Sequence, residues 1–261
     1  MKAVGVGRED ALVSIGAGDA RDEGNAARVV QCRRVEERDR IERAGFAVRQ
    51  RLVEAAIEAF GAYGYDATST RRLAEQAGVT LPAIQYYFGS KEGLHRAVVA
   101  HIAEQIEAII APAAEAAAAL LAQGDHSRKL LLARLYDMLD AFATLVFGNQ
   151  HPESWAQFVA RAEIENVVAL RPVHDCINRQ AIRPCVALIA CLLDRPAEDE
   201  QVLLRTLTIL GQILIFKKCS SKRGAHDLGF TDSDEDRLPA VQALVREQTA
   251  AILRAARGVR P

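Results

Sequence analysis

Side chains that can hydrogen-bond to duplex DNA gather in one short stretch of this chain, the octapeptide LPAIQYYF at residues 81–88 and the lysine that follows it. The amide of Gln85 can pair with adenine in the major groove. The phenols of Tyr86 and Tyr87 and the ammonium of Lys91 can bind phosphate oxygens. These residues suit recognition of a nucleic acid by hydrogen bonds and ion pairs, with no covalent step.

A helix over this octapeptide would carry these polar groups on its outer face. Ile84 and Phe88 stand four residues apart and form the apolar stripe that docks such a helix on its neighbours. Gln85, Tyr86 and Tyr87 therefore cannot all face the core.

The start of this helix is small and apolar. Thr80 can act as its N-cap, and Pro82 falls in the first turn, where the missing N–H is tolerated. Leu81, Pro82 and Ala83 would bring this end close to base edges, where an apolar side chain can touch a thymine methyl group.

A second short helix is predicted just before it, over TRRLAEQA. Leu73, Ala74 and Ala77 form its buried stripe, and Gly78 follows at the position where a left-handed residue usually ends a helix. The two helices and the tight turn between them have the pattern of a helix-turn-helix.

Residues at the start of this preceding helix are candidates for phosphate contacts. Thr68, Ser69 and Thr70 can each supply a capping hydroxyl. In a helix-turn-helix the second helix reads bases while the first crosses the backbone, so we expect Thr68, Ser69 and Arg71 to contact phosphates.

A purely structural interpretation fits the spacing as well. Two short amphipathic helices around a glycine are common in helical proteins, and a Tyr-Tyr-Phe run is more often core than recognition surface. Spacing alone leaves both interpretations open.

A family resemblance favours DNA binding. From about Arg49 to His101 the chain resembles the DNA-binding domain of the TetR/AcrR family of bacterial transcriptional regulators. The matching motifs are LVEAAIEAFGAYGYDATS, the AGVT turn, IQYYF and FGSKEGL. Many members carry tyrosine where this chain has Gln85, so the resemblance implies the docking but not the base preference.

The C-terminal half resembles a subgroup of the same family. From Phe158 to Cys219 the chain is similar to the C-terminal domain of CecR-like TetR regulators, in helix order, in the pair Arg161 and Glu163, and in the GQILIF stretch. This resemblance implies a repressor that dimerises through its final helices and responds to an effector.

Composition excludes several other classes. The 261 residues are 50% hydrophobic and 26% charged with a net charge of −1, which suits an all-α soluble protein and argues against indiscriminate coating of nucleic acid. The five cysteines lack CxxC or zinc spacing. We expect buried reduced thiols, with an oxidation sensor as the alternative, and neither metal nor cofactor.

The predicted organisation has three parts. Residues 1–46 mix small and charged residues and are expected to be a disordered extension that turns helical near its end, with a basic arm for the minor groove as the alternative. Residues 47–95 form the helix-turn-helix domain, and residues 96–261 form a helical effector-binding and dimerisation domain. We expect no signal peptide, no membrane helix and a bacterial cytoplasmic location, at the nucleoid when the operator is bound.

Periodicity predicts the helices of the larger domain. A helix capped by Ser90 should end or bend at Pro112, and apolar residues recur at helical spacing in several later segments. These are 129–147, 155–170, a long helix from Pro172 through Leu193, 202–216 and 239–253.

The penultimate of these helices is apolar around nearly its whole circumference, which is too apolar for a helix with one face in water. The simplest solution is a homodimer in which the last two helices of each copy form a four-helix interface. A helix buried within one subunit is the alternative. A two-fold dimer would present two recognition helices to a palindromic operator.

No enzymatic site is predicted. His174, Asp175 and Cys176 are consecutive on a helix and point about 100 degrees apart, so they cannot face one substrate atom. A small, mainly apolar effector in the larger domain is expected instead. The aromatic and polar candidates for contacting it are Tyr136, Trp155, Phe158, Arg161, His174 and Asn178, although core or surface-pair roles fit each of them.

Two functions from different classes remain after this reasoning. The first is a dimeric transcriptional regulator, a repressor that leaves palindromic double-stranded DNA when the effector binds. The second is a helical small-molecule-binding protein without DNA function, for which replacing Gln85 and Tyr86 would leave every activity intact.

Overall fold

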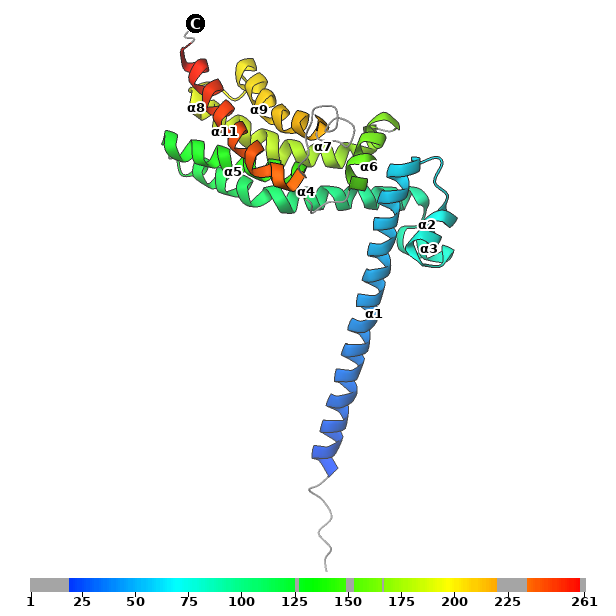
Figure 1. Cartoon of the computed structure of the whole chain (residues 1–261). Coiled ribbons are helices and arrows are strands. Elements are labelled where there is room, and N and C mark those ends of the chain that lie inside the picture. The colour runs from blue at the N-terminus through cyan, green and yellow to red at the C-terminus, as the bar shows by residue number, and fades with distance from the viewer. Residues whose placement is uncertain (1–18, 125–126, 149–152, 166, 220–233, 259–261) are drawn as a thin grey trace, which may run out of the picture. The chain divides into compact units, whose positions relative to one another are not determined.

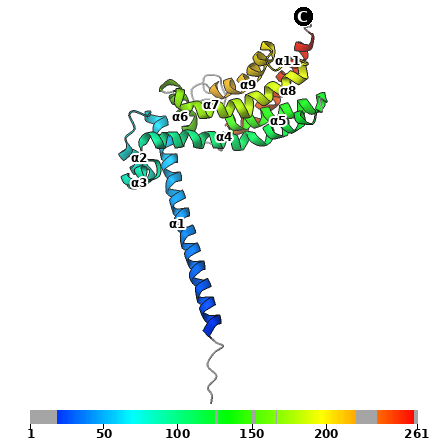
Figure 2. The same ribbon diagram turned by 180° about the vertical axis from the view of Figure 1, so that it is seen from behind.

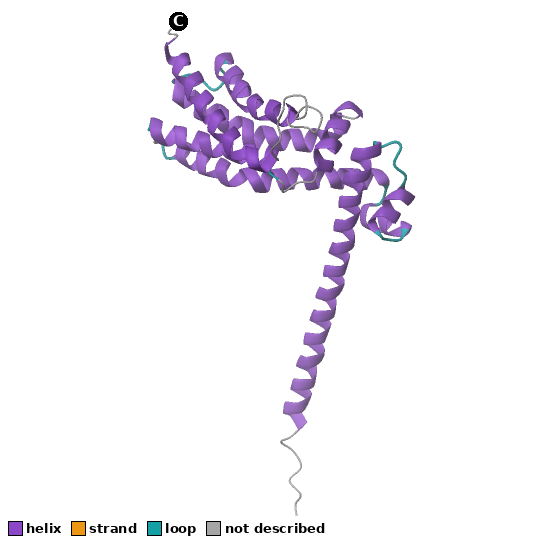
Figure 3. Cartoon of the chain, viewed as in Figure 1, coloured by secondary structure: helices purple, strands orange, loops and turns teal. Residues whose placement is uncertain are grey.

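The computed structural model describes residues 19–124, 127–148, 153–165, 167–219 and 234–258, and every regular element among them is a helix (Figure 3). The all-α prediction is confirmed. The chain divides into two compact units, residues 1–50 and 51–261. The first helix, α1 (Asp19–Tyr63), crosses the boundary between them.

The extension was predicted to turn helical only near its end, and the structure describes a helix from Asp19 onward. The sequence pattern that suggested disorder also places opposite charges four residues apart, as in Arg38 and Glu42, whose side chains lie 3.6 Å apart. Such pairs support an exposed helix. Residues 1–18 of the predicted extension lie outside the described residues.

The helix-turn-helix is built on the part of α1 from Arg51 onward. Leu52, Ile57 and Phe60 on this part are buried, and α2 (Thr70–Ala77) packs against α3 (Leu81–Phe88). The two short helices lie side by side in Figures 1 and 2. α3 also contacts the next helix, α4 (Lys91–Ala122).

α4 begins as predicted and ends later than predicted. The hydroxyl of Ser90 accepts a hydrogen bond from the backbone N–H of Gly93 at 2.9 Å, which confirms the N-cap. Pro112 does not end the helix. A proline removes one backbone hydrogen bond, and Ile110 and Ala114 on either side are held in the core with 0% and 7% exposure.

The larger helical body follows α4. α5 (Arg128–Phe147) packs along α4 and also contacts α8, α9 and α11. The remaining elements are α6 (Glu153–Glu165), a short 3₁₀ helix η1 (Val167–Leu170), α7 (Arg171–Ile177), η2 (Asn178–Ile182), α8 (Arg183–Leu193), α9 (Glu200–Cys219) and α11 (Asp234–Gly258). The helix predicted over 155–170 is therefore split into α6 and η1.

The long helix predicted from Pro172 through Leu193 contains a π-helical turn, η2. The N–H of Arg183 bonds to the carbonyl oxygen of Asn178, five residues back. Pro184 lies in the first turn of α8 and cannot donate the ordinary bond to Gln180. The wider turn just before it accommodates that missing donor.

Two helical stretches, Lys91–Ala122 and Val168–Leu193, are long and apolar enough to cross a membrane by length and composition alone. The sequence had predicted no such segment. Both contain core side chains of the helical body, among them the fully buried Val98, Ile110 and Leu188. A buried helix of a soluble protein passes the same test, so this finding is weak evidence for a membrane segment.

Candidate nucleic-acid interface and the adjoining junction

The first helix of the motif has the predicted ends. Ser69 is the N-cap of α2, and its hydroxyl accepts a hydrogen bond from the N–H of Arg72 at 3.2 Å. Gly78 ends the helix in the left-handed conformation, with φ of 62°. Leu73, Ala74 and Ala77 are buried.

The second helix separates a docked face from an open one. Ile84 is only 2% exposed, whereas Tyr86 is 82% exposed and Gln85 is also exposed. Tyr87 is half-buried and meets the Tyr86 ring edge-on, with ring centroids 4.9 Å apart. The open face of α3 therefore carries an amide and a phenol, as the sequence predicted.

The start of α3 is also open. Thr80 is the N-cap by backbone conformation, but its side chain makes no capping hydrogen bond. Leu81 is 50% exposed, Pro82 is exposed and Ala83 is half-buried. Since the helix start is not covered by other described residues, it is accessible to a large ligand such as DNA.

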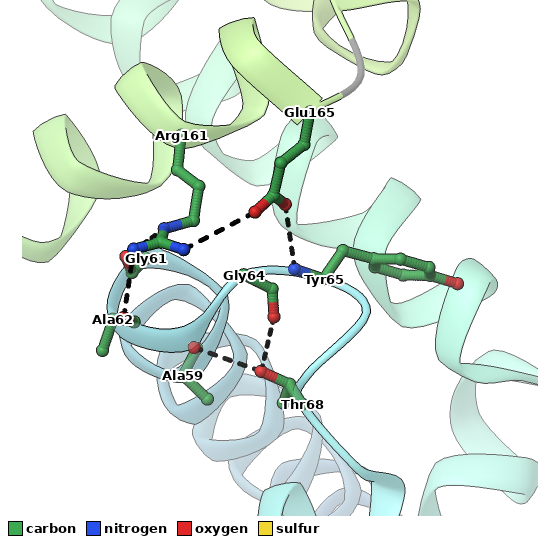
Figure 4. A network of polar contacts seen from close by, with 8 residues as sticks. All are labelled: Ala59, Gly61, Ala62, Gly64, Tyr65, Thr68, Arg161 and Glu165. Carbon is green, nitrogen blue, oxygen red and sulfur yellow. Dashed lines mark hydrogen bonds and ion pairs between the residues drawn. The ribbon is translucent and has the colours of Figure 1, made fainter.

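Thr68 does not fit the predicted phosphate contact. It is 0% exposed, and its hydroxyl lies 2.7 Å from the carbonyl oxygen of Gly64 and 3.2 Å from that of Ala59 (Figure 4). A hydroxyl donates one hydrogen and these two acceptors share it. The side chain fixes the turn between α1 and α2 rather than facing solvent.

The remaining phosphate candidates are at the surface or close to it. Arg71 is exposed and donates to Glu75, one turn along α2, at 2.9 Å. Lys91 is half-buried, with its ammonium 4.2 Å from the centroid of the Tyr65 ring. This cation–π contact holds the lysine near the end of α3 and gives Tyr65 a positioning role that sequence reasoning missed.

The six effector candidates do not form one site. Phe158 and Arg161 on α6 share a pocket, described below. Trp155 meets His101 edge-on at 5.7 Å, Tyr136 lies 5.6 Å from the guanidinium of Arg246, and His174 lies 3.9 Å from Glu163. Asn178 is exposed at the start of η2.

Arg161 and Glu165, one turn apart on α6, bind both sides of the turn that ends α1 (Figure 4). Arg161 donates to the carbonyl oxygens of Gly61 at 3.1 Å and Ala62 at 3.3 Å. Glu165 accepts from the backbone N–H of Tyr65 at 3.1 Å. We call these two side chains the α6 clamp, because they connect α6 to the end of α1.

A pocket of about 500 Å³ opens beside the α6 clamp. Four rings line it: Phe60, Tyr65, His95 and Phe158. They form a contiguous cluster, with centroids of neighbouring rings 5.1 to 6.5 Å apart. Both members of the clamp also face this pocket.

Burial dominates the titration of two groups in this region. It lowers the pKa of His95 below its usual value, with Glu165 acting in the opposite direction and Lys91 in the same one. Burial also raises the pKa of Tyr65, and the carboxylates Glu92 and Asp66 add to the effect. His95 is therefore a neutral ring near pH 7 and packs as one.

The consecutive polar residues on α7 have separate partners. Asp175 lies 3.7 Å from Arg171, His174 faces Glu163, and the thiol of Cys176 lies 3.4 Å from the carbonyl oxygen of Ala103. Three side chains with three different partners do not converge on a substrate. The described residues also include no cluster of three or more His, Cys, Asp or Glu side chains placed to hold a metal ion.

An open recognition helix, a capped helix before it and a helical body joined to both define a helix-turn-helix transcription regulator. The comparisons with known proteins agree. The model of the bacterial regulatory proteins of the tetR family matches residues 52–98, and that of the C-terminal domain of the HTH-type transcriptional dual regulator CecR matches residues 131–256.

Curated relatives narrow the class to a family. The HTH-type transcriptional dual regulator CecR of Shigella flexneri is 32% identical over 177 residues, which cover 66% of this chain and 77% of that protein. The chain therefore belongs to the TetR family of bacterial transcriptional regulators. It is a DNA-binding regulator and not an enzyme, and its family implies a cytoplasmic protein.

Solved structures agree on the fold. A TetR-family regulator from Mesorhizobium loti superimposes with a TM-score of 0.51 at 18% identity, over 81% of this chain and 97% of that one. The regulator FadR of Bacillus subtilis, solved with stearoyl-CoA, gives 0.50 at 15% identity, over 75% and 96%. At such identities the likeness supports the fold alone.

Proposed function

We propose that this regulator is a dimeric one-component repressor, which binds a palindromic operator through α3 and leaves it when a small, mainly apolar effector binds. The DNA-binding part of this proposal rests on one observation. α3 has a buried side at Ile84 and an open side at Gln85 and Tyr86. The open side presents an amide and a phenol, with Tyr86 exposed to 82%, and both groups can hydrogen-bond to duplex DNA.

The contacts divide into two kinds. Gln85 reads a base in the major groove, and the open helix start brings its apolar residues to base edges. Tyr86, Tyr87 and Lys91 contact phosphates from α3 and the residues after it. Ser69, Arg71 and Thr80, at the starts of the two helices, supply further phosphate contacts. Thr68 is left out of this set because it is buried.

The dimer is proposed from α9, which has two apolar faces. One face is buried in the helical body, with Val202, Ile209 and Ile213 at 0 to 1% exposure. The opposite face is exposed by 40 to 53% at each of its apolar residues, Leu203, Leu204, Leu207, Leu214 and Ile215. Leu244 on α11, which contacts α9, is 39% exposed.

A second copy of this chain is the occupant that these faces suit. At 100 degrees per residue the five exposed side chains of α9 fall within one arc of about 120 degrees, with Gly211 near its centre. The glycine has no neighbour within 4 Å of an added Cβ, so a facing helix can approach closely there. Isologous pairing of α9 and α11 would bury this surface twice and would match a palindromic operator.

Repression is one of two directions that the family allows. The Shigella relative is named a dual regulator, which favours activation as a second role at other promoters. The FadR structure was solved with stearoyl-CoA, and this supports effector binding by a protein of the same fold. The same proposal includes association with the nucleoid when the operator is bound. It also includes the predicted division of the chain into three parts, residues 1–46, 47–95 and 96–261.

Fluorescence anisotropy on duplexes tiled across the upstream region of its own gene tests the DNA-binding part of the proposal. The intact protein should bind one tile far more tightly than the others at two salt concentrations, and Gln85→Ala/Tyr86→Ala should abolish that preference. Glu115→Ala, an exposed change on α4, is the matched control and should bind like the unmodified protein.

Equal affinity for all tiles and for scrambled duplex would count against specific binding at this promoter. The same result on tiles from the rest of the genome would overturn the DNA-binding part of the proposal and favour a helical small-molecule-binding protein.

Sedimentation equilibrium tests the dimer, since Leu207→Asp/Leu214→Asp should give monomers if α9 is the interface.

A further inference from the structure

We propose that the pocket beside the α6 clamp binds an amphipathic organic cation with an aromatic body, and that this ligand acts on α1 through Arg161 and Glu165. The regulatory part rests on the proposed function, whereas the binding part stands without it. This pocket includes only Phe158 and Arg161 of the six side chains that the sequence suggested for the effector.

Size and lining set the body of the ligand. A pocket of about 500 Å³ lies within the range of sites for small organic molecules. Its walls are the four-ring cluster around His95 together with Ala162, Val168 and Ala169. Flat aromatic molecules stack favourably on such rings and are held there by apolar contact.

The charges around the pocket favour a cation. Asp66, Glu92 and Glu165 line it, against the guanidiniums of Arg96 and Arg161. Each arginine already lies 3.6 Å from one of these carboxylates, Arg96 from Glu92 and Arg161 from Glu165. Asp66 has no ion pair or hydrogen bond within the described residues, so one carboxylate is left over.

The rings add to this preference. The faces of phenylalanine and tyrosine rings attract cations, and the Tyr65 ring already holds the ammonium of Lys91 at 4.2 Å. Lys91 does not line the pocket, but its single charge equals the excess of one carboxylate over the two lining arginines, so the preference for a cation rests on the lining carboxylates and on the rings that Lys91 does not cover. Because burial keeps His95 neutral, that ring contributes no positive charge to oppose a cationic ligand.

The α6 clamp connects the pocket to the helix-turn-helix. Oε2 of Glu165 holds the N–H of Tyr65, while Oε1 lies 3.6 Å from Nη1 of Arg161, beyond hydrogen-bond distance. A ligand cation that pairs with Oε1 competes with Arg161. The same two side chains then serve both the ligand and the end of α1, which couples the two equilibria.

Binding is measured first without DNA. The probes are (9-anthracenylmethyl)trimethylammonium and 9-anthracenecarboxylate, which share one ring system and differ in charge, titrated by anthracene fluorescence. The cation should bind the intact chain, and Asp66→Asn/Glu165→Gln should weaken it by at least about tenfold. Glu163→Gln, on the same helix but outside the pocket, should leave it unchanged.

Three results would overturn the site: no binding of the cation, equal binding of the anion, or equal affinity of the cation for the double variant. Circular dichroism and thermal melting establish that the variants are folded. Glu165→Gln alone keeps an oxygen for the N–H of Tyr65, so it separates loss of charge from loss of the clamp.

Coupling between the pocket and DNA binding is measured afterwards, as the affinity of the protein for the operator tile with and without the cationic probe. Labelled DNA mixed with the probe alone is the control for direct binding of the probe to DNA. Weaker operator binding in the presence of the cation, absent in Glu165→Gln, supports the regulatory part. Probe binding without any change in operator affinity overturns the coupling and leaves the site intact. Absence of an operator would count against the proposed function and not against the pocket.

Discussion

Gly64 lies so close to Glu165 that a Cβ at this position would be 2.4 Å from Oε1 of the carboxylate. The glycine also has φ of +88°, a conformation that residues with side chains rarely adopt. The positive φ therefore favours glycine at the turn that the α6 clamp holds. The contact with Glu165 adds a smaller constraint, since the end of that flexible side chain can move.

Gly64→Ala should lower the free energy of unfolding by about 1–3 kcal/mol, since the left-handed backbone costs about 1–2 kcal/mol and Glu165 must also move away. Gly124→Ala is a matched control, with φ of +69° and no atom within 4 Å of the added Cβ. Urea denaturation measures both. Equal losses for the two variants would show that contact with Glu165 adds nothing.

Thr68→Val should lower the free energy of unfolding by about 1–3 kcal/mol, because a buried hydroxyl is replaced by a methyl group and its acceptors lose their donor. Thr68→Ser keeps the hydroxyl and should lose less. Affinity for the operator, measured well below the melting temperature, should change little for either variant. A large loss of affinity in folded Thr68→Val would restore Thr68 to the DNA-contact set.

The helix-turn-helix was predictable from sequence because its signals are local. Ser69 and Gly78 mark the ends of α2, and the spacing of Ile84 and Phe88 orients α3. Thr68 was wrongly assigned to a phosphate contact. A threonine hydroxyl can cap a helix at the surface or bond to backbone carbonyls in the interior, and the sequence does not distinguish these two roles. Its two acceptors lie on α1 and the following turn, and no local pattern shows them.

The larger domain was predictable in its helices but not in their contacts. The turn η2 follows from Pro184, a local cause that could have been inferred from the missing N–H. The α6 clamp joins residues about 100 positions apart, such as Glu165 and Tyr65, so periodicity carries no trace of it. Periodicity also did not show that only Phe158 and Arg161 of the effector candidates, one turn apart on α6, share a pocket.

His95 should make the stability of the fold depend on pH. Burial places its folded pKa below the unfolded value, so the unfolded chain binds the proton more readily. The contribution of the neutral ring to the free energy of unfolding is fully present above the unfolded pKa of about 6.5. It is lost as the pH falls through the folded pKa.

Urea denaturation between pH 8 and pH 4.5 measures this dependence. The free energy of unfolding of the unmodified chain should decline below about pH 6.5, and His95→Leu should lack this part of the decline. His174→Gln is the control, since His174 is partly exposed and outside the ring cluster. Identical pH profiles for the unmodified chain and His95→Leu would show that the ring titrates alike in both states.

Cys185 should resist modification in the folded protein. Burial raises the pKa of its thiol to about 12, and the side chain is only 1% exposed, so the reactive thiolate is scarce and shielded. Cys176 is also buried, and its pKa is raised as well. Cys191 is less buried and serves as the internal reference.

Iodoacetamide labelling at pH 8, followed by peptide mass spectrometry, should modify Cys191 before Cys176 and Cys185, and all three at similar rates in urea. Labelling of Cys185 in the native protein as fast as in urea would mean that the core around α8 opens readily. Rapid native oxidation of Cys176 or Cys185 by hydrogen peroxide would revive the oxidation-sensor alternative, because a sensor thiol must be accessible and ionised.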